Sequence, residues 1–184
     1  SSDYLSKQLL IGEALKYAVH NVPDREAFIY EDQRLTYREL LNRANHIAGW
    51  LQGQSIGRDD KVGCLFRNGL PFIELYFGVS VSGSIFVPVN FRLVSKEIEY
   101  ILNNSDVKIL FIEEEFIEVI RPIREQLPQI RKIVIVGGTE NILSLDLVLY
   151  DSIFESAVEC ANIQVASDDD THVIIYTSGT TGKP

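Results

Sequence analysis

The sequence closes on Val173-Ile174-Ile175-Tyr176-Thr177-Ser178-Gly179-Thr180-Thr181-Gly182-Lys183-Pro184. Its first three residues are apolar and β-branched, which predicts a buried strand. The glycines that follow allow a tight turn that brings backbone N–H groups close to an anion. Hydroxyl side chains add rotatable donors, and Lys183 adds a positive charge. The stretch therefore predicts a strand followed by a loop that binds a polyphosphate.

Two common phosphate loops do not fit this stretch. The Walker loop needs a glycine five residues before Gly182 and a Ser or Thr after Lys183, where this chain has Thr177 and Pro184. The dinucleotide fingerprint needs a third glycine beside Gly179 and Gly182. Pro184 also disfavours helical geometry at Lys183, so we expect no helix to begin directly there.

Residues 176–184 closely resemble the phosphate-loop signature of the AMP-forming adenylating enzymes. This superfamily includes acyl-CoA synthetases, aryl-CoA ligases, peptide-synthetase adenylation domains and firefly-type luciferases. Residues 35–40 resemble its first core motif, for which we expect a structural role. Gly83 and residues 88–93 are similar to the second core motif in the form usual for CoA synthetases. Peptide-synthetase domains more often carry Pro-Ile-Asp where this chain has Pro88-Val89-Asn90, so the resemblance favours a CoA ligase.

The resemblance implies a reaction in two steps. ATP and a carboxylic acid form an acyl-adenylate and pyrophosphate, and the thiol of CoA then displaces AMP. The loop would neutralise charge on the departing pyrophosphate. By resemblance the residues that bind ATP are Thr177, Ser178, Gly179, Thr180, Thr181, Gly182 and Lys183. Thr177 would also ligate Mg²⁺, and a further lysine of the family follows the proline, beyond Pro184.

Members of the superfamily run far beyond residue 184. The resemblance implies that the acidic Mg²⁺ ligand, the adenine and CoA sites, most of the acyl pocket and the catalytic lysine lie downstream, so we assign no catalytic residue here. We expect the chain to be the N-terminal part of an acyl-CoA synthetase for a medium- or long-chain fatty acid, and to be inactive alone. A peptide-synthetase-type adenylation domain, a luciferase-like enzyme and a non-catalytic nucleotide-binding module remain alternatives.

Composition agrees with a globular chain. The 184 residues are 46% hydrophobic, enough for one sizeable core, and we expect residues 1–184 to form a single α/β domain within a larger AMP-binding domain. The net charge of −9 without a basic run disfavours sequence-independent nucleic-acid binding. No membrane-length apolar run or signal peptide is visible. Cys64 and Cys160 form no C-x-x-C pattern, and Cys64 lies in an apolar run that predicts a buried thiol. Free thiols are typical of a reducing compartment, so we expect a cytoplasmic protein.

Apolar runs and periodicity predict alternating strands and helices. We expect strands at 61–66, 85–89, 107–112 and 131–136. Helices are expected at 5–19, from the capping box 36–39 to about Gly53, at 72–82, from Ser95 as N-cap to 104, and at 113–126, where Pro122 interrupts or shortens the helix. A hairpin is expected at 27–37, and a short helix within 151–158. Solidly apolar strands predict a three-layer α/β fold, with a largely parallel sheet and helices on both faces.

Several polar residues carry no chemistry in this interpretation. The histidines show no metal-ligand spacing. The acidic run 113–115 is expected to be a solvated helix start, because adjacent helical residues point in different directions. The run 168–170 lies at the opposite end of the last strand from the phosphate loop, which argues against a metal site. Asn90 and Arg92 are expected to brace a strand end. Ligands of such sheets bind beyond the carboxyl ends of the strands, where residues 177–183 fall.

Overall fold

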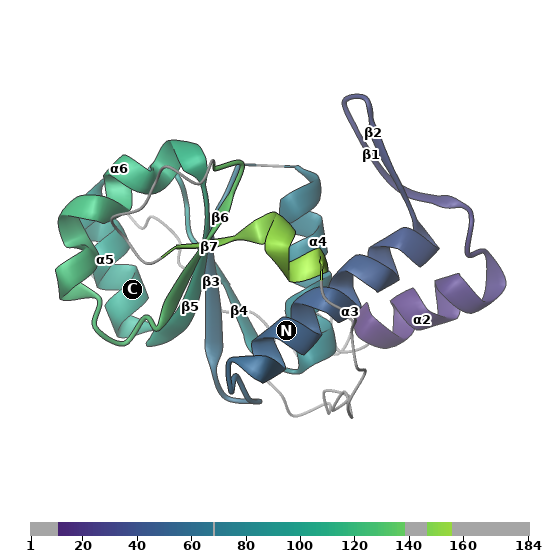
Figure 1. Ribbon diagram of the computed structural model, residues 1–184, viewed down its shortest axis with the longest axis horizontal. Helices are drawn as coiled ribbons and strands as arrows, with labels where there is room; N and C mark the ends of the chain where they lie inside the picture. Colours follow the sequence, from purple (N-terminus) through teal and green to yellow (C-terminus); the bar gives the residue numbers. More distant parts are fainter. Residues whose placement is uncertain (1–10, 68, 139–146, 156–184) are drawn as a thin grey trace, which may run out of the picture. The chain divides into compact units, whose positions relative to one another are not determined.

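The computed structural model describes residues 11–67, 69–138 and 147–155 (Figure 1). These residues divide into two compact units. Unit 1 comprises residues 11–60, 69–85 and 151–155. Unit 2 comprises residues 61–67, 86–138 and 147–150. No helix in this described part of the chain has the length and apolar character that crossing a membrane would require.

Unit 1 is built from helices and one hairpin. The antiparallel strands β1 (Glu26–Tyr30) and β2 (Gln33–Thr36) form the predicted hairpin. The helices are α2 (Ile11–Asn21), α3 (Tyr37–Gly53), α4 (Leu70–Ser82) and most of the 3₁₀ helix η3 (Tyr150–Phe154). The predicted capping box is confirmed: Thr36 Oγ1 accepts the N–H of Glu39 at 3.2 Å, and the Glu39 carboxylate accepts the N–H of Thr36 at 3.0 Å.

Helices α3 and α4 approach each other closely. Gly78 on α4 faces Ile47 on α3, and a Cβ atom at Gly78 would lie 2.6 Å from Ile47 Cγ2. Leu40, Ala44 and Ala48 of α3 are fully buried in the core of unit 1. The small side chain at Gly78 is therefore what allows the two helix backbones to come together.

A buried carboxylate joins three segments of unit 1. Glu74 on α4 is only 4% exposed, and both of its carboxylate oxygens accept hydrogen bonds from Arg43 on α3. The guanidinium carbon of Arg43 lies 3.4 Å from the ring centre of Phe154 in η3. A carboxylate this buried needs a partner, because burying an unpaired charge is strongly unfavourable.

We expect Glu74→Gln to lower the free energy of unfolding by about 1–3 kcal/mol, because a buried hydrogen bond loses its charge. Glu26→Gln is the matched control. Its carboxylate pairs with Arg34 at 2.8 Å, but both side chains are well exposed. Exposed ion pairs contribute about 0–1 kcal/mol. Urea unfolding curves of both variants measure the difference, and equal losses would contradict the expectation.

Unit 2 holds the sheet. Its strands lie in the order β4 (Ile85–Pro88), β3 (Lys61–Leu65), β5 (Val107–Glu113), β6 (Lys132–Val136) and β7 (Leu147–Leu149). The pairs β3–β5, β5–β6 and β6–β7 are parallel. The helical segments are α5 (Ser95–Asn104), η1 (Glu114–Phe116), α6 (Ile117–Ile120) and η2 (Arg121–Gln126). The prediction of an α/β fold with a largely parallel sheet flanked by helices is confirmed.

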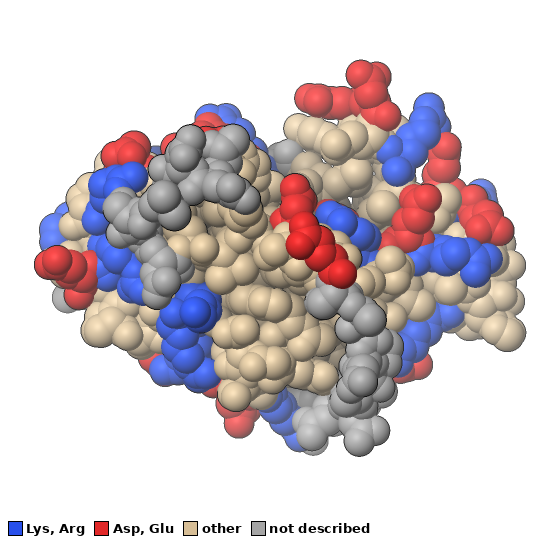
Figure 2. All heavy atoms as spheres, in the orientation of Figure 1, with Lys and Arg blue, Asp and Glu red and all other residues tan. Residues whose placement is uncertain are grey.

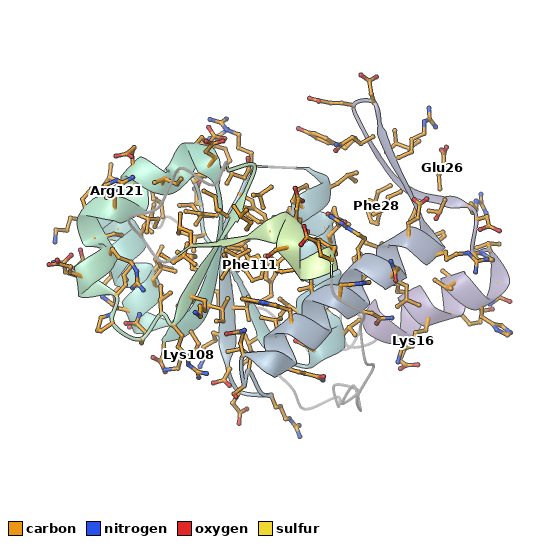
Figure 3. The ribbon with its side chains drawn as sticks, viewed as in Figure 1. Lys16, Glu26, Phe28, Lys108, Phe111 and Arg121 are labelled. Carbon is orange, nitrogen blue, oxygen red and sulfur yellow. The ribbon has the colours of Figure 1, made fainter. Side chains whose placement is uncertain are left out.

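The central strand β5 is buried on both of its faces, as a solidly apolar strand predicts. Leu110 and Ile112 pack in one cluster with side chains of α5 and α6. Ile109 and Phe111 point to the other face and are also fully buried; Figure 3 shows Phe111 among the strands. On β3, Cys64 is the buried thiol that the sequence predicts, and burial raises its pKa.

One local prediction, the N-cap of α5, is wrong, and the structure adds detail to two others. Ser95 is not the N-cap of α5: Val94 occupies that position, its N–H donates to Glu97 at 3.1 Å, and the Ser95 hydroxyl donates to the Val119 carbonyl. The helix expected at 113–126 is divided into η1, α6 and η2, with Pro122 at the start of η2. Strand β7 was not predicted, and the short helix expected within 151–158 is the 3₁₀ helix η3.

Candidate functional site

The residues predicted to bind ATP lie outside the described residues. This holds for all of Thr177, Ser178, Gly179, Thr180, Thr181, Gly182 and Lys183, for the expected strand at 173–175 and for the acidic run 168–170. Their roles, including that of Thr177 as a Mg²⁺ ligand, stay predictions. In the described ranges, no group of three His, Cys, Asp or Glu side chains could hold a metal ion.

What the structure does describe is the carboxyl edge of the sheet, the side on which open α/β sheets bind ligands. Arg67 follows β3, Phe91 and Arg92 follow β4, and Glu113 and Glu115 lie at and just after the end of β5. We call these five residues the edge cluster. Parallel pairing of β3 with β5, with Leu65 opposite Ile112, brings Arg67 to the two carboxylates.

Arg67 is the centre of the edge cluster. Its Nε donates to Glu115 at 2.6 Å, and its backbone N–H donates to the Glu113 carboxylate. Its guanidinium carbon lies 4.9 Å from the ring centre of Phe91, and that of Arg92 lies 5.5 Å from the same centre. The cluster therefore joins the carboxyl ends of three strands through two cations, two carboxylates and an aromatic ring.

The Phe91 ring packs against a second aromatic ring. It lies 5.8 Å, centre to centre, from the ring of Phe116, which is nearly buried. Asn90, next to it, accepts the backbone N–H of Arg92 through its side-chain oxygen at 3.0 Å. This bond closes a local turn after β4, and the bracing of the strand end by Asn90 and Arg92 stays a prediction.

Two charges of the cluster have altered pKa values. Burial raises the pKa of Glu113 above its ordinary value of 4.5, and the hydrogen bond from the Arg67 N–H opposes this shift only in part. The carboxylate of Glu115 adds to the rise. The hydrogen bond and charge of Glu115 raise the pKa of Arg67, which stays protonated.

The stability contributed by Glu113 should depend on pH. A carboxyl with a raised pKa holds its proton better in the folded than in the unfolded chain. Stability is therefore lost as pH rises from the ordinary pKa of 4.5 through the raised value. We expect wild type to lose stability relative to Glu113→Gln as the pH rises above 4.5 and through the raised pKa. Urea unfolding at several pH values tests this, and the opposite trend would contradict it.

The edge cluster also corrects one sequence interpretation and adds residues that it missed. The acidic run 113–115 is not simply a solvated helix start, because Glu113 ends β5 and is half-buried, and Glu115 pairs with Arg67. Arg67 and Phe91 were not singled out. Their position directly after two apolar strands was the available signal, since such positions meet at one edge.

Elsewhere on the surface, opposite charges are interspersed. Figure 2 shows Lys and Arg side chains lying among Asp and Glu side chains on the face that it displays. Lys96 pairs with Glu99 and Arg121 with Glu118, each three residues apart in sequence. These exposed pairs are typical of solvated helices and indicate no binding chemistry.

Comparisons with known proteins agree on one family. The sequence model of the AMP-binding enzyme family matches residues 15–184. The medium/long-chain-fatty-acid–CoA/3-oxocholest-4-en-26-oate–CoA ligase of Mycobacterium marinum is 33% identical over 96% of this chain. A mycosubtilin synthase protein of Bacillus subtilis is 29% identical over 97% of the chain, which corresponds to 6% of that protein.

A solved structure gives the same result at the level of the fold. The anthranilate CoA ligase AuaEII, crystallised in complex with anthranoyl-AMP, superposes with a TM-score of 0.87 and 25% identity. The match covers 95% of this chain and 33% of that one. The chain likewise spans 33% of the length of the M. marinum ligase. The chain therefore corresponds to about a third of each of these proteins.

Proposed function

Because the chain belongs to the AMP-binding enzyme family, we propose that it is the N-terminal part of an AMP-forming acyl-CoA synthetase. The observation that carries this proposal is the resemblance to fatty-acid–CoA ligases over nearly the whole chain. In the proposed reaction a carboxylic acid and ATP form an acyl-adenylate with release of pyrophosphate. CoA then takes the acyl group and AMP leaves.

The proposed substrate is a medium- or long-chain fatty acid. The name of the M. marinum relative supports this choice, because it specifies acids of that kind. We place the reaction in the cytoplasm, in agreement with the cysteine pattern. Residues 1–184 are proposed to form part of one larger AMP-binding domain, with the acyl and CoA sites supplied from beyond residue 184.

The loop 177–183 is the proposed pyrophosphate cradle. Its backbone N–H groups and the hydroxyls of Thr177, Ser178, Thr180 and Thr181 would bind the oxygens on which charge develops as pyrophosphate leaves. Thr177 is the proposed Mg²⁺ ligand of this chain, since hydroxyl oxygen is a hard donor that suits a hard cation. When bound, the ion would neutralise phosphate charge, and the loop would orient the phosphates.

A peptide-synthetase adenylation domain is the second candidate. The match to the mycosubtilin synthase protein favours it. The sequence Pro88-Val89-Asn90 counts against it, because such domains more often carry Pro-Ile-Asp there. The two candidates share the adenylation step and differ in the acid and in the acceptor of the acyl group.

The test uses the protein as its organism makes it. Acid-dependent ATP–pyrophosphate exchange is measured with octanoate, palmitate and a panel of amino acids, and thioester formation with CoA is measured for each acid that supports exchange. We expect exchange and thioester with a fatty acid. Exchange with amino acids alone would favour the second candidate, and Mg·ATP binding without any exchange would leave a nucleotide-binding module. The isolated chain is expected to be inactive.

A further inference from the structure

The Nε group of Arg67 is hydrogen-bonded, whereas its two Nη groups remain available as donors within the described ranges. Its Nε pairs with Glu115, and its guanidinium carbon lies over the Phe91 ring, 4.9 Å from the ring centre. The two Nη groups have no hydrogen-bond partner among the residues that the structure describes, and the side chain is 56% exposed. In contrast, both Nη groups of Arg124 donate hydrogen bonds, one to the carbonyl of Leu127 and one to that of Ile130. Arg67 thus keeps its planar fork of donors available.

The fork of Arg67 is also fixed in direction. An exposed arginine ordinarily loses rotamer freedom when it binds, which weakens the contact. Here Nε is hydrogen-bonded to Glu115 and the guanidinium lies over the Phe91 ring, so part of that ordering is already present. Arginine presented in this way suits bidentate contact with phosphate oxygens.

The location of Arg67 points in the same direction. The residue follows β3 at the carboxyl edge of a parallel sheet, where ligands bind. We propose that Arg67 contacts a phosphate group of a substrate and that Glu113, Glu115 and Phe91 are its positioning residues. This inference rests on the proposed function, in which the phosphate belongs either to ATP or to CoA.

The charges of the edge cluster favour phosphate over a carboxylate ligand. Arg67 and Arg92 carry two positive charges, and Glu113 and Glu115 carry two negative ones when ionised. A singly charged carboxylate gains little from a cluster with no net charge. Carboxylate and phosphate both match the fork with two oxygens, and the phosphate, which carries more charge, makes the stronger contact with the Arg67 guanidinium itself.

The experiment compares Arg67→Gln with Arg67→Lys in the complete protein. Binding of ATP, inorganic pyrophosphate and CoA is measured separately by calorimetry, and KM values for ATP and CoA are measured where turnover is present. Arg38→Gln is the matched control. Arg38 is an exposed arginine that pairs through Nε with Asp24, at 3.1 Å, and that lies on α3 in unit 1.

We expect Arg67→Gln to raise the Kd of one ligand by about 10- to 100-fold, the range that a hydrogen bond to a charged group is worth. Arg67→Lys should raise it less, because the ammonium keeps the charge but loses the fork. Arg38→Gln should change no Kd, and all three variants should unfold near the wild-type temperature.

The ligand affected identifies the source of the phosphate. Weaker binding of ATP and pyrophosphate alone places Arg67 at the nucleotide, and weaker binding of CoA alone places it at the thiol donor. Unchanged Kd values in Arg67→Gln overturn the inference, as does an equal loss for all ligands with a lower unfolding temperature. A wild-type protein that binds neither ATP nor CoA overturns the proposed function itself.

Discussion

Thr177→Val is expected to lower acid-dependent ATP–pyrophosphate exchange by about 10²- to 10³-fold, the effect of removing one donor aimed at developing charge. The substitution keeps the branched shape of the side chain and removes only its hydroxyl. That hydroxyl is the proposed ligand of Mg²⁺ and the first donor of the phosphate loop. Initial rates at saturating ATP and acid measure the effect, since the contact is proposed to strengthen as pyrophosphate departs.

The matched control for this prediction is Thr171→Val. It removes a threonine hydroxyl from the same part of the sequence, ahead of the strand expected at 173–175 and outside the loop. Its exchange rate should stay within about twofold of wild type, because the removed hydroxyl is not part of the proposed phosphate loop. Equal losses in the two variants would contradict a specific role for Thr177.

Gly78→Ala is expected to lower the free energy of unfolding by about 2–3 kcal/mol through overpacking. The new Cβ would lie 2.6 Å from Ile47 Cγ2 and 2.7 Å from Ile47 Cβ. Ile47 is fully buried, so it cannot swing away into solvent. The two helices must then separate, although alanine itself favours a helix over glycine by about 1 kcal/mol.

Two further variants isolate the contact between these helices. Gly53→Ala adds the same methyl group at the end of α3, where no atom lies within 4 Å, and should be neutral or stabilising. Ile47→Ala in the Gly78→Ala background removes Cγ2 and Cδ1 but keeps Cβ, so it relieves part of the overpacking and the two losses should be less than additive. Additive losses in urea unfolding would show that the helices do not meet at Gly78.

The sequence predicted the strands of the sheet well because their residues are solidly apolar. The runs at 61–66, 107–112 and 131–136 became β3, β5 and β6, with ends shifted by one residue. Strand β7 escaped prediction because Leu147–Leu149 is short and lies in a weakly patterned region. It forms through parallel pairing with β6, a contact that local sequence does not encode.

Helix boundaries were harder to predict because a polar side chain near a helix end can hydrogen-bond to a partner that is distant in the sequence. Ser95 has the chemistry of an N-cap, but its hydroxyl bonds to Val119, and the backbone N–H of Val94 is satisfied by Glu97. The capping box at Thr36 was predictable because both of its members lie within the same short segment.

The edge cluster could not be assembled from the sequence. Arg67 and Glu115 are 48 residues apart, and they meet only because β3 and β5 pair in one particular register. A shift of one residue would send the side chains of β5 to the opposite faces. The phosphate loop differs from the edge cluster because its residues are consecutive, so a prediction of its chemistry needs no knowledge of strand pairing. Its conformation lies outside the described residues, and its role stays a prediction.

Because Cys64 is buried on β3, the reactivity of its thiol reports when that strand opens. Only a thiolate reacts quickly with alkylating reagents, and this thiol is both 1% exposed and shifted toward its protonated form. In a Cys160→Ser background, labelling of Cys64 would therefore wait until β3 separates from its neighbours. The rate of modification, followed by mass spectrometry, would then time the opening of the sheet without any introduced probe.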